Sequence, residues 1–142
     1  MVVKSVRALV AAILIIAGPG GVQIAIADQS QIDPQALAVA QSYFDALQAG
    51  NAQKLLSLFA GRERLRNETQ LKDPTYPQFL ADRYSSANLE VLDGGVRSGV
   101  SYIDIKIWIN NNESVKERLI LKPSDDPADS TLHIVARKEL EQ

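Results

Sequence analysis

The hydrophobic positions after residue 32 first recur at the spacing of α-helices. Asp33-Pro34 is typical of a helix start, because an N-cap acid is followed by proline at the first helical position. An apolar stripe at helical spacing follows, made of Leu37, Ala40, Phe44 and Leu47. Gly50 ends this helix, and Asn51 can cap a second, shorter helix that ends at Gly61. The pattern therefore predicts two consecutive helices.

A third helix is predicted around Pro77 to Ser85, where Tyr76, Leu80 and Tyr84 lie four residues apart on one face. The preceding residues, 62 to 75, are polar and show no clear period. They begin with the only dense basic run of the chain, Arg62-Glu63-Arg64-Leu65-Arg66. We interpret this run as solvated surface, because its cations are diluted by acidic residues.

Beyond Ala87 the period changes from helical to alternating, which is typical of β-strands. Leu89 and Val91 indicate a first strand that ends at the turn signal Asp93-Gly94-Gly95. The clearest strand runs from Ser101 to Asn110, and its two sides differ in character. One side carries Ile103, Ile105, Ile107 and Ile109, and the other carries Tyr102, Asp104, Lys106 and Trp108.

Two further strands are predicted, from Ser114 to Lys122 and from Thr131 to Arg137. The first of them places Val115, Glu117, Leu119 and Leu121 on one face. Helices followed by an antiparallel meander are typical of an α+β fold. We therefore expect N-terminal helices packed on a curved antiparallel sheet of about four strands.

The first 27 residues have the three-part pattern of a cleavable signal peptide. Lys4 and Arg7 give a positive start, Ala8 to Ala17 an apolar core, and Ala25-Ile26-Ala27 a peptidase site after a Gly-Pro-Gly-Gly break. An uncleaved membrane anchor is the alternative, but a span prefers about twenty unbroken apolar residues. We therefore predict a signal peptide over 1–27, a single α+β domain over 28–142, and a periplasmic or secreted location. No membrane span is expected after cleavage.

Charge and cysteine content narrow the partners and the chemistry. The 142 residues include 15 basic and 17 acidic side chains, and removal of the leader takes away two of the basic ones. A mildly acidic domain disfavours nucleic acid as a partner unless its cations gather on one face. Because the chain has no cysteine, it forms neither a disulfide nor a lipidated cysteine, and the fold must rest on its core.

The stretch from Ala40 to Phe59 reads A-x-x-Y-F-x-A-L-x-x-G-N-x-x-x-L-x-x-L-F. Together with the later strands, it resembles the nuclear transport factor 2-like (cystatin-like cone) superfamily, particularly its small exported bacterial members, over residues 33 to 137. The resemblance implies a long first helix, a second helix directly after a Gly-Asn turn, and a curved sheet that wraps the helices into a cone. Members commonly place a tryptophan before the last strand's apolar pair, where this chain has Leu132-His133-Ile134-Val135. The superfamily includes both enzymes and non-catalytic binding domains, so the resemblance leaves the function open.

The resemblance also implies that catalytic side chains would project from the inner face of the sheet. The four isoleucines should occupy this face, because exposing each would forfeit about 1.5–3 kcal/mol. A purely aliphatic row cannot transfer a proton. The weak catalytic candidates are Glu117, as a base, with Tyr84 or Tyr76 as donor. The competing interpretation is that Glu117 reaches solvent near a strand end or edge and that both tyrosines pack in the core.

One histidine without any cysteine gives no recognisable metal-ligand spacing. The chain also contains no Gly-rich phosphate loop and no G-x-S-x-G elbow. We therefore expect neither a metal site nor a cofactor. His133 alternates with Leu132 and Ile134 and is expected to point away from the core.

The outward-facing Tyr102 and Trp108 suggest a contact surface for a protein partner or a homodimer, although cover by a loop would explain them equally well. We predict an exported, non-catalytic binding domain for a protein partner or a small apolar ligand. Two alternatives stay open. One is a small acid–base enzyme, of isomerase or hydrolase type, that uses Glu117; the other is an immunity-type or inhibitor protein.

Overall fold

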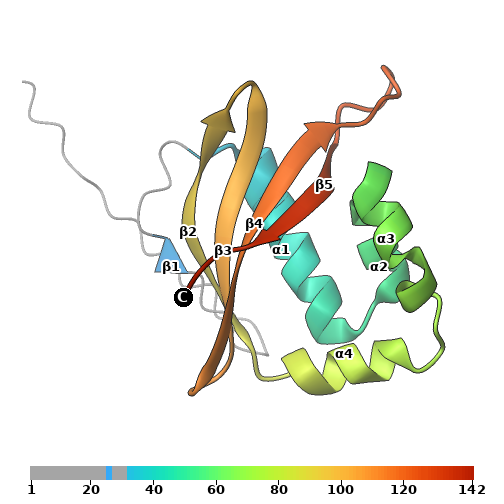
Figure 1. Cartoon of the computed structure of the whole chain (residues 1–142), viewed down its shortest axis with the longest axis vertical. Coiled ribbons are helices and arrows are strands. Elements are labelled where there is room, and N and C mark those ends of the chain that lie inside the picture. Colours follow the sequence, from blue (N-terminus) through green and yellow to red (C-terminus); the bar gives the residue numbers. More distant parts are fainter. Residues whose placement is uncertain (1–24, 27–31) are drawn as a thin grey trace, which may run out of the picture.

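The computed structural model describes residues 25–26 and 32–142, and it has an α+β fold in which helices precede an antiparallel sheet (Figure 1). The helices are α1 (Pro34–Ala49), α2 (Ala52–Leu58), α3 (Gly61–Leu71) and α4 (Tyr76–Tyr84). The antiparallel strands are β2 (Asn88–Arg97), β3 (Val100–Asn110), β4 (Glu113–Pro123) and β5 (Leu132–Glu139). The predicted fold class is confirmed.

A two-residue strand, β1 (Ala25–Ile26), adds to the edge of the sheet by pairing with β2 in parallel. The strand order is β1-β2-β3-β4-β5. β1 falls inside the predicted signal peptide, and the rest of that prediction lies outside the described residues. Cleavage after Ala27 would remove β1 and keep the four antiparallel strands. None of the described helices combines the length and the apolarity needed to cross a bilayer.

α1 begins and ends where the sequence predicts. The Asp33 side chain accepts a hydrogen bond from the Gln35 N–H at 2.8 Å, and proline occupies the first turn. Gly50 ends the helix in the left-handed conformation, with φ of 63°. A side chain at Gly50 would place its Cβ 2.1 Å from the carbonyl oxygen of Pro77, so glycine also permits the close approach of α4. Asn51 then caps α2 by accepting from the Lys54 N–H.

The segment from Gly61 to Leu71 differs from the expectation. Gly61 does not end α2; it begins α3, in the left-handed region with φ of 59°. α3 occupies most of the stretch in which the sequence shows no period. Its only buried residues are Glu63 and Leu71, so it has no apolar stripe that could have revealed it.

The expected turn at Asp93-Gly94-Gly95 is also wrong. β2 passes through these residues and ends at Arg97, and the turn lies at Ser98-Gly99. A β-bulge follows Val91 in the pairing with β3. Gly94 permits close packing, because a Cβ at this position would lie 3.1 Å from the side chain of Ile32.

The four helices lie on one side of the sheet, which we call its inner face (Figure 1). The isoleucine row of β3 is buried against them, as predicted. The other fully buried large side chains are Tyr43, Phe44, Leu80, Leu89, Leu119, Leu121 and Ile134. The opposite, outer face of the sheet is covered by none of the described helices.

Candidate functional site

Polar side chains gather at the inner face of the sheet beneath α3. We call this group the inner cluster; it consists of Tyr43 on α1, Glu63 and Asn67 on α3, Glu117 on β4 and Arg137 on β5. Arg137 is the centre of the cluster. Its Nε donates to Glu63 Oε1 at 2.5 Å, its Nη1 to the Tyr43 hydroxyl at 3.0 Å, and its Nη2 to Asn67 Oδ1 at 2.9 Å.

Each member of the inner cluster has a partner. The Tyr43 hydroxyl donates to Glu117 Oε2 at 2.9 Å, and Asn67 Nδ2 donates to Glu63 Oε1 at 3.0 Å. Burial raises the pKa of Tyr43 well above its ordinary value, and the nearby Glu117 raises it further. Burial alone would lower the pKa of Arg137, but the charges and hydrogen bonds around it outweigh burial and raise it. Tyr43 therefore stays neutral and Arg137 stays charged.

The inner cluster attaches α3 to the sheet. α3 buries little apolar surface, whereas the Glu63 side chain is only 4% exposed and lies against Arg137. A buried carboxylate without a counter-charge would cost several kcal/mol. Arg137 thus neutralises the buried Glu63, and all three guanidinium nitrogens of Arg137 donate to members of the cluster.

Glu117, the weak catalytic candidate, lies on the inner face directly across from Ile105, and it is half-buried. The structure does not bring it to the expected donors: its hydrogen-bond donor is Tyr43. Tyr76 and Tyr84 are partly buried and pack against the core, in line with the competing interpretation. The Tyr76 ring stacks on Phe79 with centroids 5.6 Å apart, and burial raises the pKa of the Tyr76 hydroxyl.

The outer face of β3 carries the side chains that alternation predicts. Asp104 lies on this face but is only 6% exposed, because Arg118 covers it and donates to both of its oxygens at 2.7 and 2.9 Å. The Arg118 guanidinium also lies 4.5 Å from the centroid of the Tyr102 ring. The Tyr102 hydroxyl donates to Asp93 Oδ2 at 3.2 Å. Tyr102 is therefore held in place by its neighbours on the sheet.

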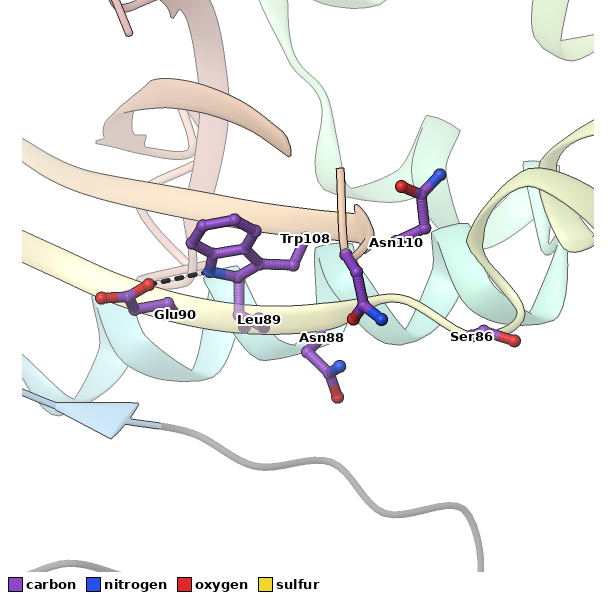
Figure 2. Close-up of a pocket in the computed structure, with 7 residues that line it drawn as sticks. Ser86, Asn88, Leu89, Glu90, Trp108 and Asn110 are labelled. Atoms are coloured by element: carbon purple, nitrogen blue, oxygen red, sulfur yellow. Dashed lines mark hydrogen bonds between the residues drawn. The ribbon is translucent and has the colours of Figure 1, made fainter. Parts of the chain in front are cut away.

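Trp108 borders a surface depression of about 410 Å³ at one end of the outer face (Figure 2). The depression is lined by Ser86, Asn88, Leu89, Glu90, Trp108, Asn110 and Asn111. The indole Nε1 donates to Glu90 Oε2 at 3.0 Å, and the Lys106 ammonium lies 3.8 Å from the ring centroid. Lys106 is not among the residues that line the depression. Trp108 remains 36% exposed there.

The sequence singles out Trp108 but not the polar residues around it. Asn88 begins β2, whereas Asn110 and Asn111 lie at the hairpin between β3 and β4. The pairing of Asn88 with Trp108 across the two strands brings these separate segments together. No local sequence signal could have revealed this grouping, because it arises only when the strands pair.

His133 lies on the outer side of β5, across from Lys122, with its Nε2 3.5 Å from Asp129 Oδ2. This placement agrees with the expectation that it points away from the core. Over residues 25–26 and 32–142, no group of three or more histidine, aspartate or glutamate side chains is arranged to hold a metal ion.

Comparison with protein-family models, curated proteins and solved structures finds no match to this chain. Function must therefore be inferred from the two polar regions themselves. The side chains of the inner cluster are hydrogen-bonded to one another, whereas the outer face presents an exposed aromatic ring beside a depression. The outer face is the stronger candidate for contact with another molecule.

Proposed function

We propose that this protein is an exported, non-catalytic binding domain that holds a protein partner on the outer face of its sheet. The observation that carries the proposal is the exposure of Trp108 beside a depression, on a face that no described helix covers. Tryptophan and tyrosine are enriched at the energetic centres of protein interfaces. Tyr102 lies on the same face and is fixed by Asp93 and Arg118, so it would lose little side-chain entropy on binding.

We also propose that the domain belongs to the nuclear transport factor 2-like superfamily. Two features support this membership: the Gly50-Asn51 turn that separates α1 from α2, and the placement of all four helices on one face of the antiparallel sheet. Export rests on the leader pattern of residues 1–27. Its test is the mass of the chain recovered from outside the cytoplasm, which should correspond to residues 28–142; a full-length mass would contradict cleavage.

A small apolar ligand is less well supported than a protein. The isoleucine row of the inner face is buried by other side chains, and only two of the seven residues that line the depression, Leu89 and Trp108, are hydrophobic. Apolar ligands are bound in pockets lined predominantly by hydrophobic side chains. An immunity-type or inhibitor protein would be one form of the proposed binding domain.

An acid–base enzyme that uses Glu117 also has less support. The Oε2 atom of Glu117 accepts the Tyr43 hydrogen bond, and Glu117 does not line the depression. A general base needs a reacting atom within hydrogen-bond reach. Turnover that disappears in Glu117→Gln while the fold is kept would revive this alternative.

Site-specific photo-crosslinking tests the proposed surface. A photoreactive amino acid is placed at Asn111, which is exposed and lines the depression, in the full chain expressed in its native host. We expect a discrete protein adduct at this position and a weaker one when Trp108→Ala is added. The matched control is Lys54, which is exposed on α2 at the helical side. No adduct at Asn111, or equal adducts at both positions, would refute the proposed surface.

A further inference from the structure

Basic side chains face one another on the outer side of β3, β4 and β5. The strand register places Lys106 directly opposite Lys116, and Arg118 directly opposite Lys138. We call these four residues the basic patch. Side chains directly opposite on neighbouring strands have Cβ atoms about 4.5–5.5 Å apart, and like charges in that arrangement destabilise a sheet.

The basic patch is only partly neutralised within the protein. Arg118 pairs with Asp104, and Lys106 lies over the Trp108 ring with Glu90 directly opposite it on β2. Within residues 32–142, no carboxylate oxygen lies within 4.0 Å of the ammonium groups of Lys106, Lys116 or Lys138. The full chain has fewer basic than acidic side chains, 15 against 17, so the local positive charge of the patch is opposite in sign to the net charge of the chain.

We propose that the basic patch binds an acidic segment of the protein partner, while the Trp108 depression accepts a neighbouring part of the same segment. This inference rests on the binding function proposed above and adds the chemistry of the partner. Carboxylates beside Lys116 and Lys138 would relieve the repulsion that the strand register creates. The complementarity would mainly increase the association rate and the selectivity for acidic partners.

The same outer face carries acidic residues that favour a protein over an extended polyanion. Glu90, Asp93 and Asp104 lie on the outer side of β2 and β3, next to the patch. A lipid surface or a nucleic acid presents negative charge over a wide area and would meet these carboxylates as well. A peptide can place its acidic residues against the lysines alone, and the carboxamides of Asn88, Asn110 and Asn111 can bond its backbone. A second copy of this chain, docked with the patches facing each other, would place cation against cation.

The test uses a defined probe: an eight-residue peptide that alternates glutamate and glycine, with the glutamine-for-glutamate peptide as its neutral control. The chain contains one tryptophan, so intrinsic fluorescence reports on Trp108 within the proposed surface. We expect a saturable fluorescence change with the acidic peptide alone, and an affinity that falls at least about tenfold between about 0.05 M and 0.5 M salt, because salt screens exposed charges. No binding of the acidic peptide at the lower salt, or equal binding of the neutral one, would overturn the inference.

Charge-reversal variants locate the binding. Lys116→Glu with Lys138→Glu should weaken peptide binding at least about tenfold, since each added carboxylate can pair with the basic residue opposite and repels the peptide. The matched control, Lys54→Glu with Arg66→Glu, changes the net charge equally but alters exposed positions on α2 and α3. It should stay within about twofold of the wild type. If the thermal unfolding temperature of the patch variant is no lower than that of the wild type, misfolding is excluded as the cause of weaker peptide binding.

Other outcomes separate this inference from the proposed function. Equal losses of peptide affinity in the two double variants would refute the basic patch as the binding element. If the protein binds phosphatidylglycerol vesicles or single-stranded DNA but not the peptide, the ligand of the basic patch is another polyanion and not an acidic protein segment. If the Asn111 adduct persists and depends on Trp108 while Lys116→Glu with Lys138→Glu leaves it unchanged, the binding function stands and the acidic partner is wrong.

Discussion

The two faces of the sheet carry charge in opposite arrangements. On the inner face, Arg137 is surrounded by Glu63, Asn67 and Tyr43, which accept from three of its nitrogens. On the outer face, Lys116 and Lys138 each stand opposite another cation. The inner charge is paired within the fold, whereas the two cross-strand cation pairs of the outer face oppose folding slightly. This difference indicates that folding accounts for the first and that binding accounts for the second.

The physical reason lies in the solvent. A buried charge without a partner costs several kcal/mol, so the inner face tolerates Arg137 only with its network intact. Exposed charges are screened by water and salt, and like pairs on a surface cost only a few tenths to about 1 kcal/mol. The outer face can therefore retain cations that reduce stability slightly and still fold.

The largest effect is expected from Arg137→Met, which keeps an unbranched apolar stem but removes the charged guanidinium group. Glu63 would remain buried without a counter-charge, so the free energy of unfolding should fall by about 3 kcal/mol. Urea denaturation measures the change. The double variant Arg137→Met with Glu63→Gln should recover part of the loss. A single variant within about 0.5 kcal/mol of the wild type would show that the inner network is not structural.

Tyr43→Phe should have a smaller effect, about 1–2 kcal/mol, because it removes one hydrogen bond to Glu117 and one from Arg137. The pH dependence of the free energy of unfolding supplies a second readout. Since the pKa of Tyr43 is raised in the folded state, that state keeps a proton which the unfolded chain loses above pH 10.0. The contribution of Tyr43 to stability is thus complete below that pH and declines as pH rises beyond it. Denaturation at several alkaline pH values should show a shallower decline for Tyr43→Phe; identical slopes would contradict the burial of an un-ionised hydroxyl.

The smallest effect, and one of opposite sign, is expected on the outer face. Lys116→Glu and Lys138→Glu should each leave the free energy of unfolding unchanged or raise it by about 0.5 kcal/mol, because a repulsive cross-strand pair becomes attractive. Urea denaturation at low salt measures the difference, which should shrink at high salt. A clear loss of stability would mean that these lysines have a structural role and would remove the contrast between the faces.

Features encoded by neighbouring residues could be predicted from the sequence. The caps at Asp33 and Gly50 delimit α1, and the strict alternation of β3 gives the orientation of its isoleucines and of Trp108. α3 could not be predicted, because its inward residue is a carboxylate and not part of an apolar stripe. The sequence places Glu63 in a run that is expected to be solvated. Its basic neighbours are exposed, but Glu63 itself is buried.

Arg137 was missed for a geometric reason. Simple alternation from Ile134 would turn Ala136 inward and Arg137 outward. The register between β4 and β5 shifts between Ile120 and Leu121, and this irregularity reverses the expected orientation, so Arg137 stands across from inward-facing Leu119. The Trp108 depression and the basic patch likewise depend on which strands pair and in what register, which the sequence alone does not specify.

Amide chemical shifts in an NMR titration with the glutamate–glycine peptide test the contrast between the faces most directly. We expect the largest changes in β3, β4 and β5 around Lys106, Lys116, Lys138 and the Trp108 indole N–H, with α3 and the residues around Arg137 nearly unaffected. Changes centred on Glu63, Arg137 and Glu117 would show that the inner cluster is the binding site and would contradict the account.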